Sequence, residues 1–291
     1  MIKTIPFRRR AIGTAIALAI LPFSGGVSAP LAAAEPVSSA SSRLTYADLA
    51  DLADAANAVV HVKVTSQAIV SPERAPNVAP GMVRIYVEAA TVALVSGSAP
   101  VGESLRYLVD LPLDSRGKAP KLKKQDFLLF ARAVPGRPGE LQLVGAGAQQ
   151  PWTPELEQRI RPILTAMLSP AAPPHITGVR DALAVPGTLA GESETQMFLS
   201  TRSGDPVSIS VVRRPGMAPV WGVSFSEIVD QAARPPARDS LEWYRLACFL
   251  PAQLPAKANL SRDSVSRALA EDDYAYVMQQ LGPCARTLSR Q

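Results

Sequence analysis

The chain has 291 residues, of which 30 are basic and 25 acidic, and 47% are hydrophobic, so it can bury a core of its own. Four basic residues and no acidic residue lie in the first 34 positions, which leaves 26 basic against 25 acidic residues in the rest. This balance argues against nucleic-acid binding and against electrostatic binding to a membrane surface. The longest basic cluster, at 121–124, is expected to be a solvated turn.

The segment 1–34 predicts a secretory signal peptide. Lys3 and the arginines at 8–10 form a basic leader, 11–23 is an uncharged apolar run, and the alanines at 32–34 suit cleavage. The apolar run is shorter than the roughly 20 residues of a membrane-spanning helix, so cleavage is favoured over a retained anchor. The consecutive arginines leave the twin-arginine route open beside the general one. We therefore expect a periplasmic or secreted chain without a membrane span.

The first expected element of the mature chain is a short helix at 45–56. Leu49, Leu52 and Ala56 recur at helical spacing behind Thr45, a good capping residue. Acidic residues come early in this segment, where the helix dipole favours negative charge. The helix should lead directly into the first strand.

Five strands are expected between this helix and residue 144, separated by turns rich in proline and glycine. In the first, Val60, Val62 and Val64 alternate with polar residues, which places His61 on a polar, exposed face with Lys63. Two strands are long enough to bend across two sheets, so the pattern predicts a small antiparallel barrel or sandwich, with the OB type as the first interpretation. The expected strands are 58–70, 82–95, 103–111, 126–134 and 140–144.

The fourth of these strands has apolar residues on both faces. Phe127, Leu129 and Ala131 share one face, and Leu128 and Phe130 share the other. Such a strand cannot leave either face in water, so we expect it in the middle of the fold.

The runs at 53–62 (ADAANAVVHV), 87–97, 102–103 and 126–131 (DFLLFA) together resemble secreted barrel domains related to netrin modules and tissue metalloprotease inhibitors. The resemblance covers a minority of the chain and implies an OB-like barrel. In that family the inhibitory edge depends on an amino-terminal Cys-x-Cys, whereas this region contains no cysteine. The resemblance thus implies the fold and not the inhibitor activity.

A helix at 151–168 closes the first half. Thr153 is a good cap and Pro154 suits the first helical position, while Pro162 should bend the helix. The proline-rich stretch at 169–174 is typical of a stiff linker. We therefore predict a barrel domain at 43–168, the linker, and a second domain at 175–291. The helix should pack through one apolar stripe, formed by Leu156, Ile160, Leu164 and Met167 or Leu168.

The second half begins with an expected antiparallel meander of four strands. A segment at 226–233 could form a short helix, and 239–250 is ambiguous between helix and buried strand, with helix favoured. A stronger helix is expected at 261–281, capped by Asp263 or Ser264 and stopped by a Gly-Pro pair. The expected strands are 176–185, 194–201, 206–213 and 220–225.

The two cysteines, Cys248 and Cys284, predict a structural disulfide because the chain is expected to be exported. The bond would hold the carboxy-terminal helix down by closing a loop of about 35 residues. A redox pair is the alternative, but such pairs are usually spaced Cys-x-x-Cys.

Catalytic, cofactor and metal sites are not predicted. The two histidines, His61 and His175, do not form a metal-binding motif and are each expected to be surface residues. No nucleophile motif stands out. Asp110 and Asp114 flank a proline turn and could bind a cation, although turn chemistry is the commoner reason for such a pair. The glycines at 145–147 lack the context of a dinucleotide-binding loop.

Trp152, Trp221 and Trp243 are expected to be core or staple residues rather than a carbohydrate platform. The sequence therefore predicts an exported α+β protein with an antiparallel OB-like barrel or sandwich and a second antiparallel meander with carboxy-terminal helices. Its expected function is non-catalytic binding or assembly in a bacterial-type cell envelope, with an envelope protein or glycan as partner. The alternative is a secreted hydrolase whose site is assembled from residues distant in sequence.

Overall fold

The structure, a computed structural model, describes residues 43–97, 101–226 and 233–288. All of them belong to one compact unit that begins at Ser42. The expected signal peptide at 1–34 and most of the expected helix at 226–233 lie outside the described residues. The prediction of a domain boundary at 169–174 stays a prediction.

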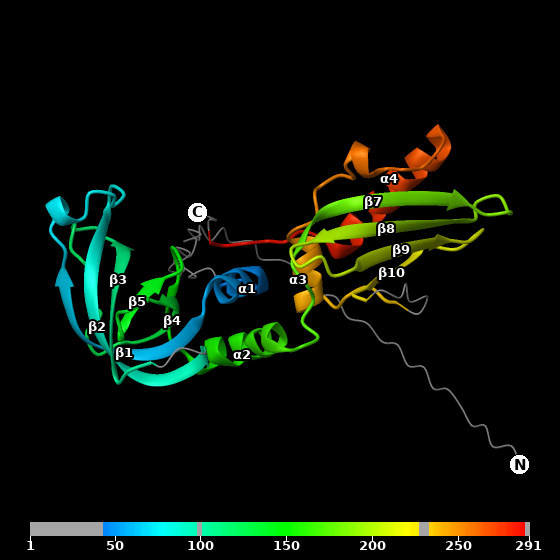
Figure 1. Ribbon diagram of the computed structural model, residues 1–291. Coiled ribbons are helices and arrows are strands. Elements are labelled where there is room, and N and C mark those ends of the chain that lie inside the picture. The colour runs from blue at the N-terminus through cyan, green and yellow to red at the C-terminus, as the bar shows by residue number, and fades with distance from the viewer. Residues whose placement is uncertain (1–42, 98–100, 227–232, 289–291) are drawn as a thin grey trace, which may run out of the picture. The chain divides into compact units, whose positions relative to one another are not determined.

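The fold is α+β, as predicted, with a closed five-stranded barrel, a second sheet of four antiparallel strands, and carboxy-terminal helices (Figure 1). The barrel strands run in the order β1-β2-β3-β5-β4, and β4 closes the barrel on β1. This is an OB-like barrel. Its strands are β1 (Ala58–Ile69), β2 (Met82–Gly97), β3 (Ser104–Pro112), β4 (Asp126–Ala133) and β5 (Glu140–Leu143).

The barrel is mixed rather than wholly antiparallel, which corrects the prediction. Arg106 and Tyr107 of β3 pair in parallel with Glu140 and Leu141 of β5. The reason is topological: β5 turns back from β4 through a tight hairpin, and closure then brings it beside β3 in the same direction. A further strand, β6 (Gln149–Pro151), pairs with β4 and was missed because three residues are too few to show alternation.

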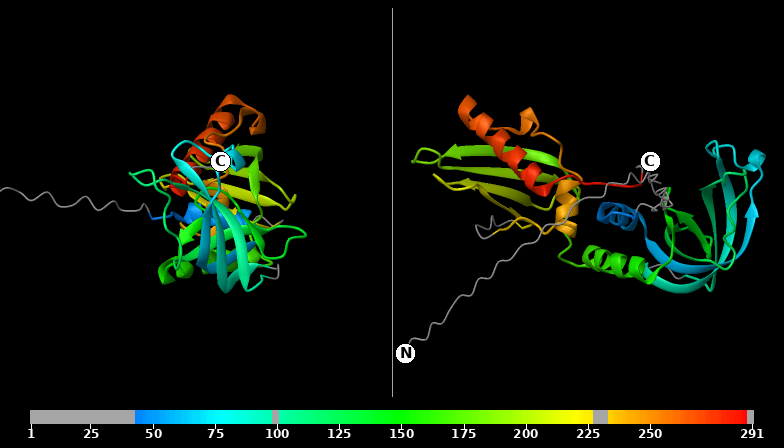
Figure 2. Two further views of the ribbon diagram at one scale, coloured as in Figure 1. Left: turned by 90° about the vertical axis from the view of Figure 1, so that its left-hand side faces the viewer. Right: turned by 180° about the vertical axis from the view of Figure 1, so that it is seen from behind.

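The interior of the barrel forms one of two apolar cores. β1 and β2 are strongly curved (Figure 2), and the register of their pairing shifts at three points, as β-bulges do when a strand bends. The buried side chains of this core come from all five strands: Ala58, Val60, Val62, Val64, Ile85, Val87, Ala89, Leu105, Tyr107, Val109, Phe127, Leu129, Ala131 and Leu141, with Leu122 from a loop.

The outer face of β4 belongs to the second core. Leu128 and Phe130 are fully buried there, beside helix α1 (Tyr46–Ala55) and helix α2 (Pro154–Leu168). β4 is therefore a wall with an apolar core on each side, which confirms its predicted place in the middle of the fold. The second core continues beyond α1 and α2 into the carboxy-terminal elements.

Both helices begin where the sequence predicts. Thr45 and Asp48 form a capping box at the start of α1, and Thr153 caps α2. The predicted apolar stripe of α2 packs on the second core: Ile160 and Leu164 are buried, and Leu156 and Met167 are partly buried against it. Ile163 is buried as well, whereas Leu168 is 74% exposed. Leu168 is the last residue of the helix and extends beyond the core that the middle of α2 covers.

The second sheet is a meander in the order β10-β9-β8-β7, with helix α4 (Ser264–Leu281) along one face (Figure 1, Figure 2). The ambiguous segment at 239–250 forms a helix, α3 (Leu241–Ala247), capped by Ser240. The strands of this sheet are β7 (Ile176–Pro186), β8 (Ser193–Thr201), β9 (Val207–Arg213) and β10 (Val220–Ser224).

Cys248 and Cys284 are joined in a disulfide with an S–S distance of 2.05 Å. Cys248 ends α3, and Cys284 follows Gly282, where α4 ends. The bond thus fixes the start of the chain's last segment to α3. Within the part of the chain that is described, no helix combines the length and apolarity needed to cross a bilayer.

Replacing both cysteines by serine (Cys248→Ser with Cys284→Ser) should lower the free energy of unfolding by at most about 4 kcal/mol, because the bond closes a loop between residues 36 apart in sequence. Urea denaturation of the oxidised protein and of the double variant measures the difference, with the reduced wild type as a control that leaves the side chains unchanged. Equal stability of the oxidised protein and the variant would contradict a stapling role.

Candidate functional site

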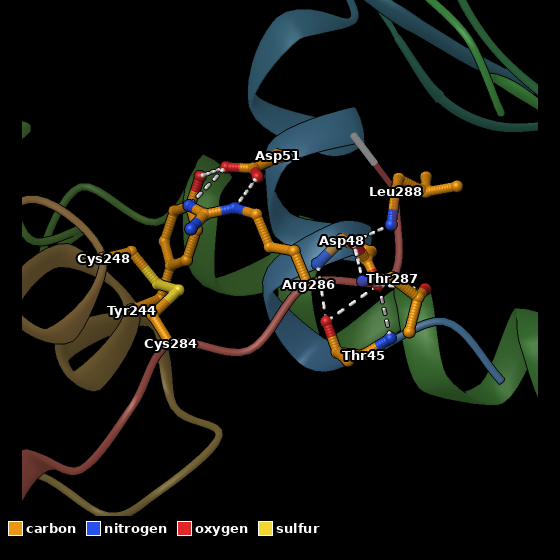
Figure 3. Close-up of polar contacts among 9 residues, drawn as sticks. All are labelled: Thr45, Asp48, Asp51, Tyr244, Cys248, Cys284, Arg286, Thr287 and Leu288. Carbon is orange, nitrogen blue, oxygen red and sulfur yellow. Dashed lines mark hydrogen bonds and ion pairs between the residues drawn. A yellow bond between two sulfur atoms is a disulfide. The ribbon is translucent and has the colours of Figure 1, made fainter. Parts of the chain in front are cut away.

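Helix α1 carries three aspartates, Asp48, Asp51 and Asp54, at a spacing of three residues, which places them along one side of the helix. Each of them binds a segment that follows the barrel in sequence, and Figure 3 shows the first two with their partners. These contacts determine where α3 and the last segment of the chain lie against α1.

Asp48 is almost fully buried and binds the residues after the disulfide. Its carboxylate accepts the backbone N–H of Thr287 at 3.0 Å, the Thr287 hydroxyl at 2.7 Å and the N–H of Leu288 at 3.0 Å (Figure 3). The backbone N–H of Thr45 also donates to it, at 2.8 Å. Burial alone would raise the pKa of Asp48, but these hydrogen bonds outweigh it and hold the pKa below its usual value.

Asp51 binds one residue near each cysteine of the disulfide. The Tyr244 hydroxyl donates to its carboxylate at 2.6 Å, and Arg286 Nε donates at 2.5 Å (Figure 3). Burial, together with the hydrogen bond to Asp51, raises the pKa of Tyr244, so the phenol stays protonated and keeps donating. The hydrogen bond to Asp51 likewise raises the pKa of Arg286.

Asp54 binds Arg245, a guanidinium that is 3% exposed, at 2.9 Å, and His175 at 3.2 Å. Arg245 Nη1 also lies 3.0 Å from His175 Nδ1. Since a guanidinium can only donate, Nδ1 must accept, and the neutral ring then donates from Nε2 to Asp54. Burial and the neighbouring Arg245 lower the pKa of His175, which agrees with a neutral ring. His175, expected to be a surface residue, is half-buried, with its side chain 26% exposed.

A cleft of about 690 Å³ lies between α1, α2, the linker and the start of α3. Leu49 and Ile163 are buried at its base, and α1, which the aspartates connect to α3, provides one wall. This cleft is the candidate functional site. Its lining residues are Tyr46, Leu49, Arg159, Pro162, Ile163, Ala166, Ser169, Ala171, Pro173, Asp239, Ser240, Leu241 and Glu242.

The charges in the cleft are unevenly placed. Asp239 and Glu242 lie at the start of α3, and Arg159 of α2 donates to the carbonyl of Leu44 at 2.5 Å. Burial, together with Glu242 and Asp239, raises the pKa of Tyr46 to about 12. The Tyr46 phenol is therefore neutral at physiological pH, mainly because it is partly buried and secondarily because of the two carboxylates.

A smaller cavity of about 230 Å³ opens at one end of the barrel, beside the turn between β4 and β5. Leu105 and Leu141 of the barrel core line it together with Pro138 and Arg137. Its lining is mostly apolar and brings together fewer polar groups than the larger cleft.

His61 is buried, which corrects the expected exposed position. Its ring stacks on Trp152 with centroids 4.3 Å apart, and Nε2 lies 3.3 Å from an Asp126 oxygen. β1 pairs with β2 on one side and β4 on the other, and Trp152, just before α2, covers the face that alternation alone would leave in water. The Trp152 indole N–H donates to Glu157, so each of the two stacked rings also contacts a carboxylate.

The remaining candidate residues have structural contacts. Asp110 forms two hydrogen bonds with Arg84, each 2.7 Å long, and Asp114 accepts backbone N–H groups of its own turn. Trp221 and Trp243 are core residues. Within the described ranges, no group of three or more His, Cys, Asp or Glu side chains is placed to hold a metal ion.

Neither the protein-family models nor the curated proteins give a match to this chain. The proposals below therefore rest on the geometry of the cleft and on the sequence.

The position of His175 predicts a pH dependence of stability. Because its pKa is lowered in the folded state, the unfolded chain takes up a proton first as the pH falls below about 6.5, and the free energy of unfolding should fall with it. Protonation would place a cation beside Arg245 and near Arg202, with Asp54 as the opposing charge. Urea denaturation between pH 7.5 and 5.5 should show a steeper loss for the wild type than for His175→Gln. Equal slopes would contradict the assignment.

Proposed function

We propose that the protein is an exported, non-catalytic binding protein of the cell envelope that engages a partner in the cleft between α1, α2 and α3. The observation that carries this proposal is the cleft itself, which has an apolar base and a charged rim and a volume in the range of ligand sites. The leader at 1–34 supports export.

The cleft is held in shape before any partner arrives. Its α1 wall is connected to α3 through Asp51 with Tyr244 and through Asp54 with Arg245. A site that is already ordered loses less conformational entropy on binding than one that must form around its ligand. The OB-like barrel adds support by analogy, since barrels of this type often act as binding scaffolds. Kinship with netrin-module barrels is part of the same proposal.

Site-specific photo-crosslinking in living cells tests this function. A photo-reactive amino acid replaces Ala166, which lines the cleft, or Ala275, an exposed alanine on α4 that serves as the matched control. We expect one discrete adduct with an envelope component from position 166 and none from position 275, with the adduct identified by mass spectrometry. The same adducts from both positions, or none from position 166, would contradict binding in the cleft.

A further inference from the structure

We propose that the occupant of the cleft is a polypeptide segment that carries a lysine or arginine next to an apolar side chain. This inference rests on the proposed function and names the chemistry of its ligand. The apolar side chain would pack on the base of the cleft, while the cation would lie between the start of α3 and the end of α2.

The base of the cleft suits an apolar side chain. Leu49 of α1 and Ile163 and Ala166 of α2 face a space that Leu241 of α3 closes from the other side. An apolar group placed there gains about 25 cal/mol for each Å² removed from water. Grooves between helices take amphipathic segments in this way, with apolar anchors down and polar groups at the rim.

The rim suits a cation. Among the described residues, neither Asp239 nor Glu242 has an ion-pair partner within 4 Å, although both line the cleft. The one basic residue of the described lining, Arg159, donates to the Leu44 carbonyl and keeps its positive charge, which Asp239 favours from a distance without forming an ion pair. Burial is the main reason why the pKa of Tyr46 is raised, and these two carboxylates raise it further. The lining thus holds two carboxylates against one guanidinium, and a positively charged ligand would balance the remaining negative charge.

The end of α2 adds to this field. Ala166 and Ser169 line the cleft at the carboxy-terminal end of the helix, where backbone carbonyls give a partial negative charge. The last turn of α2 contains no basic side chain to offset it. Pro162, also in the lining, has no N–H to donate to the carbonyl four residues earlier. The carboxy-terminal end of α2 therefore favours the same sign of ligand charge as Asp239 and Glu242, whereas the amino-terminal end of α3, which also lines the cleft, carries the opposite partial charge.

A polypeptide fits better than a small amine. The cleft, at about 690 Å³, is much larger than an ammonium group needs, and its lining comes from three helices and a linker. Apolar contacts at the base and charge at the rim can be made together by neighbouring side chains of a single chain segment. We therefore assign the occupant to a protein partner rather than to a glycan.

Glu242 also has an explanation that involves no ligand. It lies in the first turn of α3, where a carboxylate stabilises the helix through its dipole. That role predicts that Glu242→Gln lowers stability and leaves binding unchanged, so the experiment must measure both.

The test uses acetylated, amidated hexapeptides with the centre Leu-Lys-Leu, Leu-Gln-Leu or Leu-Glu-Leu, with binding to the purified protein measured by fluorescence anisotropy. We expect the lysine peptide to bind roughly tenfold more tightly than the glutamate peptide, since partly exposed charge pairs contribute modest energies. The double variant Asp239→Asn with Glu242→Gln should abolish this preference.

A matched control is Glu271→Gln with Asp272→Asn, which removes the same two charges from exposed positions on α4. We expect this control to keep the lysine preference, and thermal denaturation of all variants checks that each is folded. Loss of the preference in the control as well would overturn the assignment to the cleft and leave only the net charge of the protein as its cause.

Ala166→Trp fills the cleft and separates the two proposals. If it abolishes both the cellular adduct formed from a photo-reactive residue at position 162 and the binding of the lysine peptide, both proposals stand. If it abolishes the adduct while the wild type shows no preference among the peptides, binding in the cleft stands and the cationic ligand is overturned. If it leaves the adduct unchanged, the proposed function is overturned.

Equal binding of hexylamine and the lysine peptide would overturn the polypeptide assignment.

Discussion

The structure depends on three carboxylates of α1, each of which is hydrogen-bonded to later parts of the chain. Asp48 is buried, whereas the side chains of Asp51 and Asp54 are 25% and 22% exposed. A buried ionised group such as Asp48 or Arg245 is costly unless hydrogen-bond partners surround it, and losing one partner leaves its charge uncompensated. Asp48 is bound by the residues after Cys284, Asp51 by Tyr244 and Arg286, and Asp54 by Arg245 and His175. The helix that precedes the barrel in sequence thus fixes the elements that come last.

The fold contains two apolar cores that lie on opposite faces of one strand. β4 separates them, with Phe127 and Leu129 facing the barrel interior and Leu128 and Phe130 facing α1 and α2. The second core would be open to water on its far side without the carboxy-terminal elements, so the hydrogen bonds of α1 and the burial of its apolar face act together. The candidate cleft is a consequence of how the three helices are held, because α1, α2 and α3 do not pack directly against one another where the cleft lies.

Local patterns in the sequence predict most of the helices and strands, but they do not predict which distant residues these elements contact. Thr45 and Thr153 marked helix starts correctly, and the two apolar faces of 126–134 placed β4 in the centre. The aspartates of α1 could be noticed from their spacing. Apart from Thr45, however, their donors lie more than 100 residues away, and no periodicity predicts such pairs. The predicted exposure of His61 is wrong because alternation predicts which face of a strand a residue lies on and not what covers that face. The parallel β3–β5 pair likewise arises from barrel closure rather than from either strand.

Calorimetry of the purified protein tests the central claim, that α1 makes the barrel and the carboxy-terminal elements one cooperative structure. The account predicts a single thermal transition with equal calorimetric and van't Hoff enthalpies. It also predicts that Asp51→Asn, which weakens the contacts with Tyr244 and Arg286, lowers the midpoint of that transition without splitting it. Two transitions in the wild type, only one of which moves in the variant, would show that the barrel and the second sheet are stable independently and would contradict the account.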